Sequence, residues 1–376
     1  VAPAKHSPPP EAVPSAAMAT TLPCKRAAPS SSVFIGVDVG TGSARAAAFD
    51  LAGHLLGEAS SELKTRTPQP EHFEQSSEDI WLACCKAVRG ALAAAGTTEV
   101  AGVAFDATCS LVVLGDGDAP LAVGANLPDS EGISSSEAEV FNVIMWCDHR
   151  ATAEAEAINA TGHRLLKNVG GAVSPEMEMP KLSWLKCCRP FTFRATRRFF
   201  DLPDYLTYRA AGGCAAAGEG AGLRSACTVV CKWNFDAAAH DWDAAFLAEI
   251  GLADLGSQRI GAAEDVREVG ARVPGGVCAA AATDLGITSA AALGIGMIDA
   301  HAGGLGCLGG EPPPPHATGA MPLEMRLVLI AGTSTCHMAC SQESVFVPGV
   351  WGPYASAMVP GFFFERGRPE FCGSGD

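Results

Sequence analysis

Two short stretches at opposite ends of the chain share one pattern of apolar and polar residues. Residues 33–39 form an apolar run that ends in Gly-Thr-Gly-Ser and continues into a second run over 43–49. Residues 327–331 form a similar run that ends in Gly-Thr-Ser-Thr and also continues into a second run. Each pattern predicts a strand, a tight turn and a returning strand.

The two predicted turns have a composition that suits phosphate binding. Glycine lets the backbone take positive φ and lets a ligand approach closely, while hydroxyls and turn N–H groups face outward as donors. Two such turns, one from each of two domains, can hold a polyphosphate between them. Asp38, on the first strand, is then expected to hold the accompanying Mg²⁺ through water. The pattern therefore indicates a nucleotide cleft between duplicated domains.

The pattern after the first hairpin predicts the rest of a sheet and a helix. A turn at 50–53 gives three antiparallel strands over about 33–64. Ser76, with Asp79 three residues later, is typical of a capping box that opens a helix. That helix carries an apolar stripe, formed by Trp81, Leu82, Cys85, Val88, Ala91 and Leu92. A strand over 100–105 follows, with Asp106-Ala107-Thr108 at its carboxyl end, where ligands of open α/β sheets bind.

The remaining pattern predicts an α/β fold of two related lobes. The next predicted elements are a hairpin near 115–118, a polar surface loop over 125–140, a strand over 143–146, an Ala/Glu-rich helix after Arg150, and helix or loop over 251–296. A proline run at 312–315 suits a loop near the domain junction. We expect a first lobe over 33–305, and residues 306–376 are expected to begin the second.

Composition limits the class of protein. The 376 residues leave room for two domains, and the net charge of −15 argues against a nucleic-acid partner. No apolar run reaches membrane-spanning length, so no membrane partner is expected. Fifteen cysteines, an odd number, favour reduced thiols in the cytoplasm. The Cys336-His337-Cys340 group suggests zinc, but alternation along a strand favours buried structural thiols.

The first 32 residues differ in composition from the rest of the chain. They are rich in Pro, Ala and Ser and lack a periodic apolar pattern, which favours a disordered leader. Lys25 and Arg26, with no acid between Met18 and Val33, are also typical of a transit segment for a plastid or another organelle. Translated sequence ahead of a start at Met18 is a further alternative.

An acid in the stretch 296–306 is the candidate for catalysis. Asp299 directly follows an apolar run and precedes small residues, which places its carboxylate at a helix N-terminus in a crowded cleft. Such a carboxylate can accept a hydroxyl proton as the oxygen attacks a γ-phosphate. A simple helix cap explains the same pattern equally well. His301 is expected to be a packed core histidine.

With these motifs in place, the chain resembles the FGGY family of carbohydrate kinases, and within it the pentulose kinases of ribulokinase type. The family belongs to the actin-like, ribonuclease-H-like ATPases. The matching stretches lie between Val33 and Glu365 and are 38–45, 105–111, 146–151, 173–177, 180–181, 200–206, 231–233, 298–303 and 332–337. The set in this order is far more specific than one glycine-rich turn.

The resemblance implies a role for individual residues. Asp299 corresponds to the catalytic base. The first phosphate and Mg²⁺ motif corresponds to Asp38, Gly40, Thr41, Gly42, Ser43 and Arg45, and the second to Gly332, Thr333 and Ser334. The ketopentose is then held by the backbone at Ala107, by Lys232, by Asp299 and by Glu365. Without the family, a solvated lysine beside Trp233 is the other interpretation of Lys232. Asp148 and Arg150 either line the sugar pocket or pair with each other.

The resemblance implies ATP-dependent phosphorylation of a ketopentose, with D-ribulose favoured and ATP and Mg²⁺ required. L-ribulose, ribitol and xylulose are alternative substrates, and a homodimer stays open. The pattern departs from the family after Glu365, where Arg366 follows in place of Gly, and the second lobe is expected to be truncated at Asp376. A catalytically silent sugar-binding or regulatory protein is therefore the second hypothesis. An actin-type or chaperone-type ATPase is disfavoured, since it has no need of Lys232 and Asp299 together.

Overall fold

A central six-stranded sheet contains neighbouring parallel strands whose carboxyl ends lie at the same edge of the sheet. The computed structural model describes residues 32–125, 139–215, 222–287, 290–309, 321–331, 334–367 and 370–371. The sheet contains β1 (Val33–Val39), β2 (Ser43–Phe49), β3 (Leu55–Glu62), β5 (Val100–Ala107), β11 (Ala292–Leu293) and β12 (Met297–Ile298). Strands β1, β2 and β3 are antiparallel, as predicted, whereas β1, β11 and β12 each pair with β5 in parallel.

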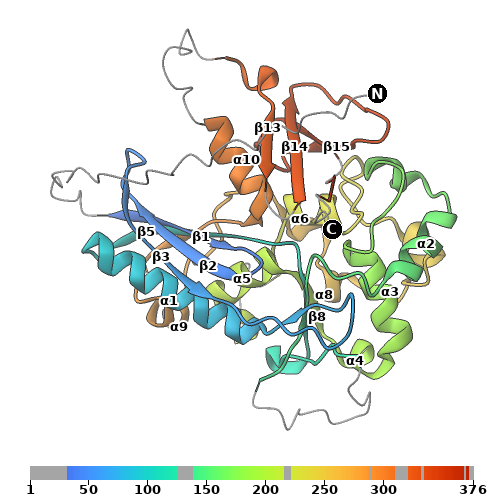
Figure 1. The fold of residues 1–376 in the computed structure, drawn as a ribbon, viewed down its shortest axis with the longest axis horizontal. Helices are drawn as coiled ribbons and strands as arrows, with labels where there is room; N and C mark the ends of the chain where they lie inside the picture. Colours follow the sequence, from blue (N-terminus) through green and yellow to red (C-terminus); the bar gives the residue numbers. More distant parts are fainter. Residues whose placement is uncertain are drawn as a thin grey trace, which may run out of the picture.

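Helix α1 (Ser77–Ala95) covers one face of this sheet (Figure 1). The Ser76 side chain accepts the Asp79 N–H at 3.4 Å, so the predicted start of the helix is confirmed. The predicted stripe is buried except for Leu82, which is 65% exposed. That assignment was wrong because Leu82 is one step around the helix from Trp81, while Cys85 and Val88 continue the face of Trp81.

A second group of elements lies beside the central sheet, drawn mostly in green in Figure 1. It holds the sheet β4-β7-β6-β8, made of β4 (Glu74–Gln75), β7 (Val143–Ile144), β6 (Leu111–Leu114) and β8 (Arg198–Asp201). Its helices are α2 (Thr152–Ala160), α3 (Glu178–Cys188) and α4 (Pro190–Ala195). The strand predicted over 143–146 ends at Ile144, because Asp148 N–H donates back to the Met145 carbonyl and closes a turn.

The remaining elements are shorter. They are α5 (Leu202–Ala211), α6 (Ala226–Lys232), α7 (Ala244–Glu249), α8 (Ser257–Ile260), α9 (Ala279–Leu285) and the parallel pair β9 (Arg224–Ser225) and β10 (Val266–Arg267). Single 3₁₀ turns lie at Asp116–Asp118, Arg164–Asn168, Gly213–Ala215, Ala263–Asp265 and Leu323–Met325. The prediction of helix and loop over 251–296 is confirmed apart from the two-residue strands β10 and β11.

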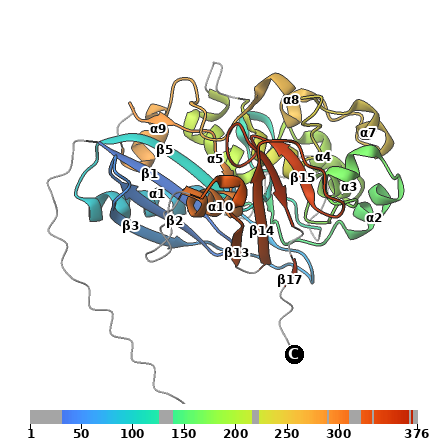
Figure 2. The ribbon, with the colours of Figure 1, turned by 90° about the horizontal axis from the view of Figure 1, so that it is seen from above.

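A third sheet, in the C-terminal part, packs against α10 (Asp299–Gly309). It has the order β13-β14-β16-β15, with β17 beside β14, and consists of β13 (Val328–Ala331), β14 (Ser334–Ser341), β15 (Trp351–Ala355), β16 (Phe363–Arg366) and β17 (Glu370–Phe371). The second predicted hairpin is therefore confirmed as the pair β13–β14. Figure 2 shows α10 between the blue central sheet and these strands. The expected lobe boundary at 305/306 falls within α10.

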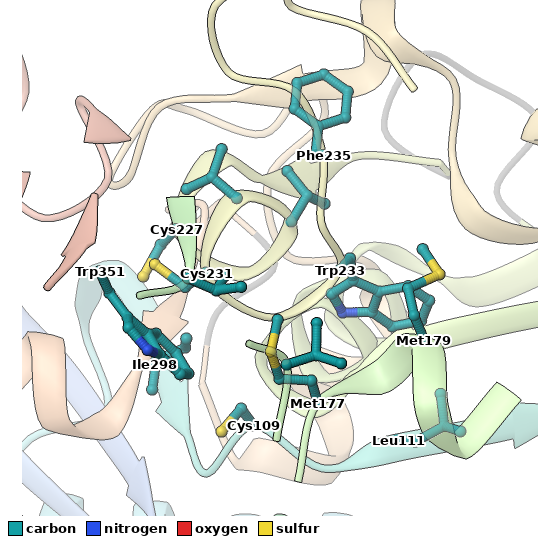
Figure 3. Packing of buried hydrophobic residues seen from close by; sticks show 14 of the residues in the cluster. Cys109, Leu111, Met177, Met179, Cys227, Cys231, Trp233, Phe235, Ile298 and Trp351 are labelled. Atoms are coloured by element: carbon teal, nitrogen blue, oxygen red, sulfur yellow. The ribbon is translucent and has the colours of Figure 1, made fainter. Parts of the chain in front are cut away.

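Buried side chains form two apolar clusters, one around the central sheet and one between the second group and the third sheet. Figure 3 shows part of the latter, including Trp233, Met177 and Trp351. Cys336 and Cys340 are buried while His337 between them is exposed, which agrees with structural thiols. Among the described residues, no group of three or more His, Cys, Asp or Glu side chains is arranged to hold a metal ion.

Three predictions concern residues outside the described ranges: the leader, most of the polar loop at 125–140 and the proline run. Within the described ranges, no helix is both long enough and apolar enough to cross a bilayer.

Candidate active site

A cleft of about 730 Å³ opens at the carboxyl ends of β1, β5 and β12. Its walls come from the central sheet, from α6 and α10, and from β13 and β14. Six of the predicted site residues line it: Asp38, Gly40, Thr41, Arg45, Lys232 and Asp299. The cleft therefore collects residues that are more than 250 positions apart along the chain.

Three carboxylates meet in this cleft because three neighbouring parallel strands end there. Asp38 pairs in register with Asp106, and Met297, two residues before Asp299, pairs with Asp106 from the other side. Burial raises the pKa of Asp106 to about 9, and the charges of Asp38 and Asp299 and a hydrogen bond with Asp38 add to that rise. Negative charge therefore gathers at this end of the cleft. The Arg45 guanidinium lies 3.3 Å from the Asp38 carboxylate and offsets part of it.

The first glycine turn is held in place by its own backbone and by the second group of elements. Gly40 N–H donates to the Ser43 carbonyl at 3.0 Å. The Thr41 hydroxyl accepts the Trp146 indole N–H at 3.1 Å, and the Thr41 carbonyl accepts the Gln75 amide at 2.9 Å. A Cβ atom on Gly40 would lie 2.8 Å from the Arg45 guanidinium, so glycine suits this position. Gly42 and Ser43 complete the turn and do not line the cleft.

The strands that flank the second turn reach the same cleft. Ile330 and Ala331 before the turn and Cys336 after it are lining residues. Gly332 and Thr333 lie outside the described residues. Ser334 begins β14, and its side chain is also outside the described part of the chain. The flanking strands therefore bring both hairpins to one cavity, together with Asp299.

Asp299 is the first residue of α10 and faces the cleft. Its carboxylate accepts the Ala300 N–H at 2.7 Å, from the next residue in the chain. A capping side chain accepts from a residue two or three positions further on, so this contact does not decide between the two interpretations of Asp299. His301 is fully buried, with Nδ1 2.9 Å from Cys227 Sγ and its ring against Phe364, as expected of a core histidine.

Lys232 is buried at the end of α6 with only 2% of its surface exposed. Its ammonium lies 5.2 Å from the centre of the Trp351 ring. The interpretation of Lys232 as a solvated lysine is therefore wrong. Glu176, in the turn before α3, is also a buried lining residue, and the sequence did not mark it as a site residue. The motif at 173–177 was its one signal.

Ala107 and Asp148 are not among the lining residues of the cleft, and the side chain of Glu365 lies outside the described part of the chain. Ala107 is buried in β5 between Val39 and Ile298, and its neighbours Asp106 and Thr108 line the cleft in its place. Asp148 is a correction: its carboxylate is fully buried and accepts the Arg150 guanidinium at 2.8 Å through both oxygens, which leaves it in an ion pair. Glu365 lies on β16, where it pairs with Ala339, and its side chain is outside the described residues.

The lining residues outside the predicted set include Asp106, Glu176 and Trp146. Asp106 had a signal in its position at a strand end. Trp146 begins the matching stretch 146–151, but its contact with Thr41 joins segments 105 residues apart, and no local pattern predicts it.

Comparison with known proteins gives consistent matches along the chain. Residues 33–123 match the N-terminal domain of the FGGY family of carbohydrate kinases, and residues 327–375 match the C-terminal domain of that family. An FGGY carbohydrate kinase domain-containing protein of Homo sapiens is 43% identical over 348 residues, which is 90% of this chain and 59% of the relative. A D-ribulokinase of Saccharomyces cerevisiae is 37% identical over 371 residues, which is 92% of this chain and 49% of the relative.

Solved structures share the fold at low sequence identity. A xylulose kinase from Rhodospirillum rubrum has a TM-score of 0.68 at 19% identity, over 89% of this chain and 59% of that protein. A ligand-bound xylulose kinase from Lactobacillus acidophilus has a TM-score of 0.69 at 16% identity, over 90% and 60%. The fold is thus the actin-like, ribonuclease-H-like ATPase fold, and the chain spans about three fifths of the length of these relatives.

Proposed function

The chain belongs to the FGGY family of carbohydrate kinases, and from that premise we propose that it phosphorylates a ketopentose with ATP. We assign D-ribulose as the substrate and D-ribulose 5-phosphate as the product. The observation that carries the proposal is the meeting of Asp299, Lys232 and both hairpins in one cleft. The similarity to a D-ribulokinase over 92% of the chain supports the choice of sugar.

Asp299 is the general base of the proposed reaction. Its carboxylate takes the proton of the terminal hydroxyl as that oxygen attacks the γ-phosphorus, and the bond from the γ-phosphorus to the bridging oxygen breaks to release ADP. The transition state of phosphoryl transfer is loose, so a base contributes mainly through its position. Lys232, whose ammonium lies in the cleft wall, donates hydrogen bonds to sugar oxygens.

Asp38 and the turn over Gly40, Thr41, Gly42 and Ser43, with Arg45 beside it, are assigned to Mg²⁺ and the phosphates. Asp38 lines the cleft beside the turn, and the negative charges of Asp38 and Asp299 there add to the effect of burial on the pKa of Asp106, so a cation next to Asp38 would be favoured. Mg²⁺ prefers such oxygen ligands, and when bound it neutralises charge on the phosphates. Gly332, Thr333 and Ser334 are assigned to the second phosphate turn, and Glu365 to the sugar.

We assign residues 33–305 to the lobe that binds the sugar and carries the base, and residues 306–376 to the beginning of the nucleotide lobe. Contacts between α10 and β13 support a junction at this point, since a Cβ atom on Gly303 would lie 3.3 Å from Ile330.

Release of ADP in the presence of a panel of pentuloses and polyols tests the proposal. We expect release with D-ribulose, and Asp299→Asn should reduce transfer by at least about 10³-fold while sugar binding stays largely intact. Asp116→Asn, an equivalent change at an exposed aspartate, is the control and should leave turnover unchanged. The absence of sugar-dependent release with every compound would overturn the proposed activity, and unchanged turnover in Asp299→Asn would overturn the assignment of the base.

A further inference from the structure

Two oppositely charged side chains are buried in the wall of the cleft, in addition to the three carboxylates. Glu176 is 4% exposed and Lys232 is 2% exposed, yet both line the cavity. Burial of a charged group is costly unless the group is paired or has a ligand to bind. Packing alone therefore does not explain why Glu176 and Lys232 are both buried in the wall of the cleft. The sugar proposed to bind there offers hydroxyls that both groups can bind.

The Glu176 carboxylate is held by one oxygen. His149 Nε2 lies 3.4 Å from Glu176 Oε1, and the other ring nitrogen of His149 lies 3.1 Å from the Glu71 carboxylate. The Glu176 backbone is fixed by its N–H, which donates to the Ser174 hydroxyl at 3.3 Å. Within the described part of the chain, the His149 contact is the hydrogen bond that the Glu176 side chain makes, and it involves Oε1 alone.

Glu176 is ionised in this environment. Burial alone would raise its pKa, but the hydrogen bond from His149 and the charges of Lys232, His149 and Lys181 lower the pKa below its usual value. A carboxylate in this state is an acceptor only, with lone pairs on both oxygens. Lys232 beside it is a donor only. Together they complement a sugar segment that presents a hydroxyl donor next to an oxygen acceptor.

The pair lies close to the acid assigned as the base. Cys109, two residues after the end of β5, lines the same cleft. Burial raises the pKa of the Cys109 thiol to about 12, and the charges of Lys232 and Asp299 both act on the same thiol. Asp299, Lys232 and Glu176 all line one cleft of about 730 Å³, so we expect a sugar bound at Asp299 to contact Lys232 and Glu176 with its other hydroxyls.

We propose that Glu176 is a substrate-binding residue that accepts hydrogen bonds from sugar hydroxyls and so selects among ketopentoses by hydroxyl configuration. The inference rests on the proposed sugar-kinase function and adds a residue to its specificity. The alternative is that Glu176 serves only to neutralise Lys232 and stabilise the wall. The two differ in one respect, because only a binding residue is sensitive to the removal of a particular hydroxyl from the substrate.

The test is a cycle between substrate and protein. Turnover of D-ribulose and of its monodeoxy analogues is measured for the wild type, Glu176→Gln and Glu176→Ala, with Glu58→Gln, an exposed glutamate on β3, as the matched control. In the wild type, removal of the hydroxyl that Glu176 binds should lower kcat/KM by about 10²–10⁴-fold. In Glu176→Ala the same removal should cost no more than about 3-fold, because the interaction is already lost. Glu176→Gln should lower kcat/KM for D-ribulose by about 10- to 100-fold, with the KM for ATP unchanged.

The possible outcomes distinguish failure of the proposed function from failure of the role of Glu176. If the wild type neither binds nor phosphorylates any pentulose, both the function and the inference are overturned. If the wild type is active and each deoxy analogue loses the same factor in wild type and variants, only the role of Glu176 is overturned. The wild type alone also tests the inference if both variants fail to fold. If removal of each hydroxyl in turn causes no steep loss of kcat/KM in the wild type, no residue of the wall selects by hydroxyl configuration, and the inference is overturned.

Discussion

His149 lies between two carboxylates, Glu71 and Glu176, and this gives the protein a pH-dependent contribution to stability. The hydrogen bond to Glu176 raises the pKa of His149, burial opposes that rise, and the charges of Glu176 and Glu71 support it. A histidine whose pKa is higher in the folded state stabilises the fold below its unfolded pKa of about 6.5. This contribution is lost as the pH rises through the folded-state pKa.

His149→Gln should therefore lower the melting temperature most at acidic pH. We expect a deficit of about 2–4 °C near pH 5.5 that shrinks steadily up to pH 8.5. Differential scanning fluorimetry across this range measures it, with His337→Gln, an exposed histidine on β14, as the control. A deficit of constant size at all pH values would mean that His149 stabilises the fold by packing and not by charge.

Much of the candidate site could be predicted from the sequence, since motifs identified Asp38, Thr41, Lys232 and Asp299, which line the cleft. The sequence could not distinguish a charged side chain that faces the cleft from one that is paired with another residue of the protein. Asp148 and Lys232 both looked able to bind sugar. The Asp148 carboxylate, however, accepts two hydrogen bonds from the Arg150 guanidinium and one each from the Arg150 and Phe73 backbone N–H groups, which uses its four acceptor sites within the protein. Such distinctions depend on the direction of side chains in three dimensions, and spacing along the chain carries no record of it.

At the scale of elements, the packing of α1 on β3 depends on a close approach at Gly57. A Cβ atom there would lie 2.5 Å from the Ala91 carbonyl oxygen and 2.5 Å from the Ala95 nitrogen, both in the helix backbone. Backbone atoms cannot move aside without separating helix and sheet. Gly57→Ala should therefore lower the free energy of unfolding by about 1–3 kcal/mol, as measured by urea denaturation.

Gly306, on the exposed face of α10, is the matched control for Gly57. Nothing lies within 4 Å of a Cβ atom at that position. Gly306→Ala should be neutral or should stabilise by up to about 1 kcal/mol, because alanine favours the helix. Equal losses in both variants would contradict the close-approach explanation.

The first glycine turn is coupled to the second group of elements by the contact between Thr41 and Trp146. In a double-mutant cycle, Thr41→Val and Trp146→Phe should together cost less than the sum of the single changes. A coupling free energy of about 0.5–1.5 kcal/mol is expected for one hydrogen bond, from urea denaturation of the four proteins. Additive losses would show that the indole does not hold the turn.

The same elements show why part of the fold followed from the sequence. Antiparallel hairpins and capped helices are local, so the strands over 33–64 and the start of α1 were predicted correctly. Strands β11 and β12 are only two residues long and exist because they pair with β5, nearly 200 residues earlier. A two-residue strand that forms only by pairing with a distant strand is too short to show a periodic pattern in the sequence, so it could not be predicted.

At the scale of the whole molecule, exposed apolar side chains are concentrated in one part of the chain. Of the thirteen large apolar residues that are exposed in the described structure, seven lie between positions 321 and 347. They are Met321, Met325, Leu327, Leu329, Val345, Phe346 and Val347. Exposed apolar side chains in such numbers favour contact with another surface.

This 376-residue chain should therefore bind a hydrophobic dye and self-associate through these side chains. The pair Leu329→Lys and Phe346→Lys should lower dye fluorescence by about half and reduce the concentration dependence of sedimentation, because lysine keeps the strand but disfavours apolar contact. Leu51→Lys, in the turn between β2 and β3, removes a leucine that is 79% exposed at a distant position in the chain and serves as the control. If Leu51→Lys has the same effect as the pair, apolar exposure in general drives association, and the exposed side chains at 321–347 have no special part in it.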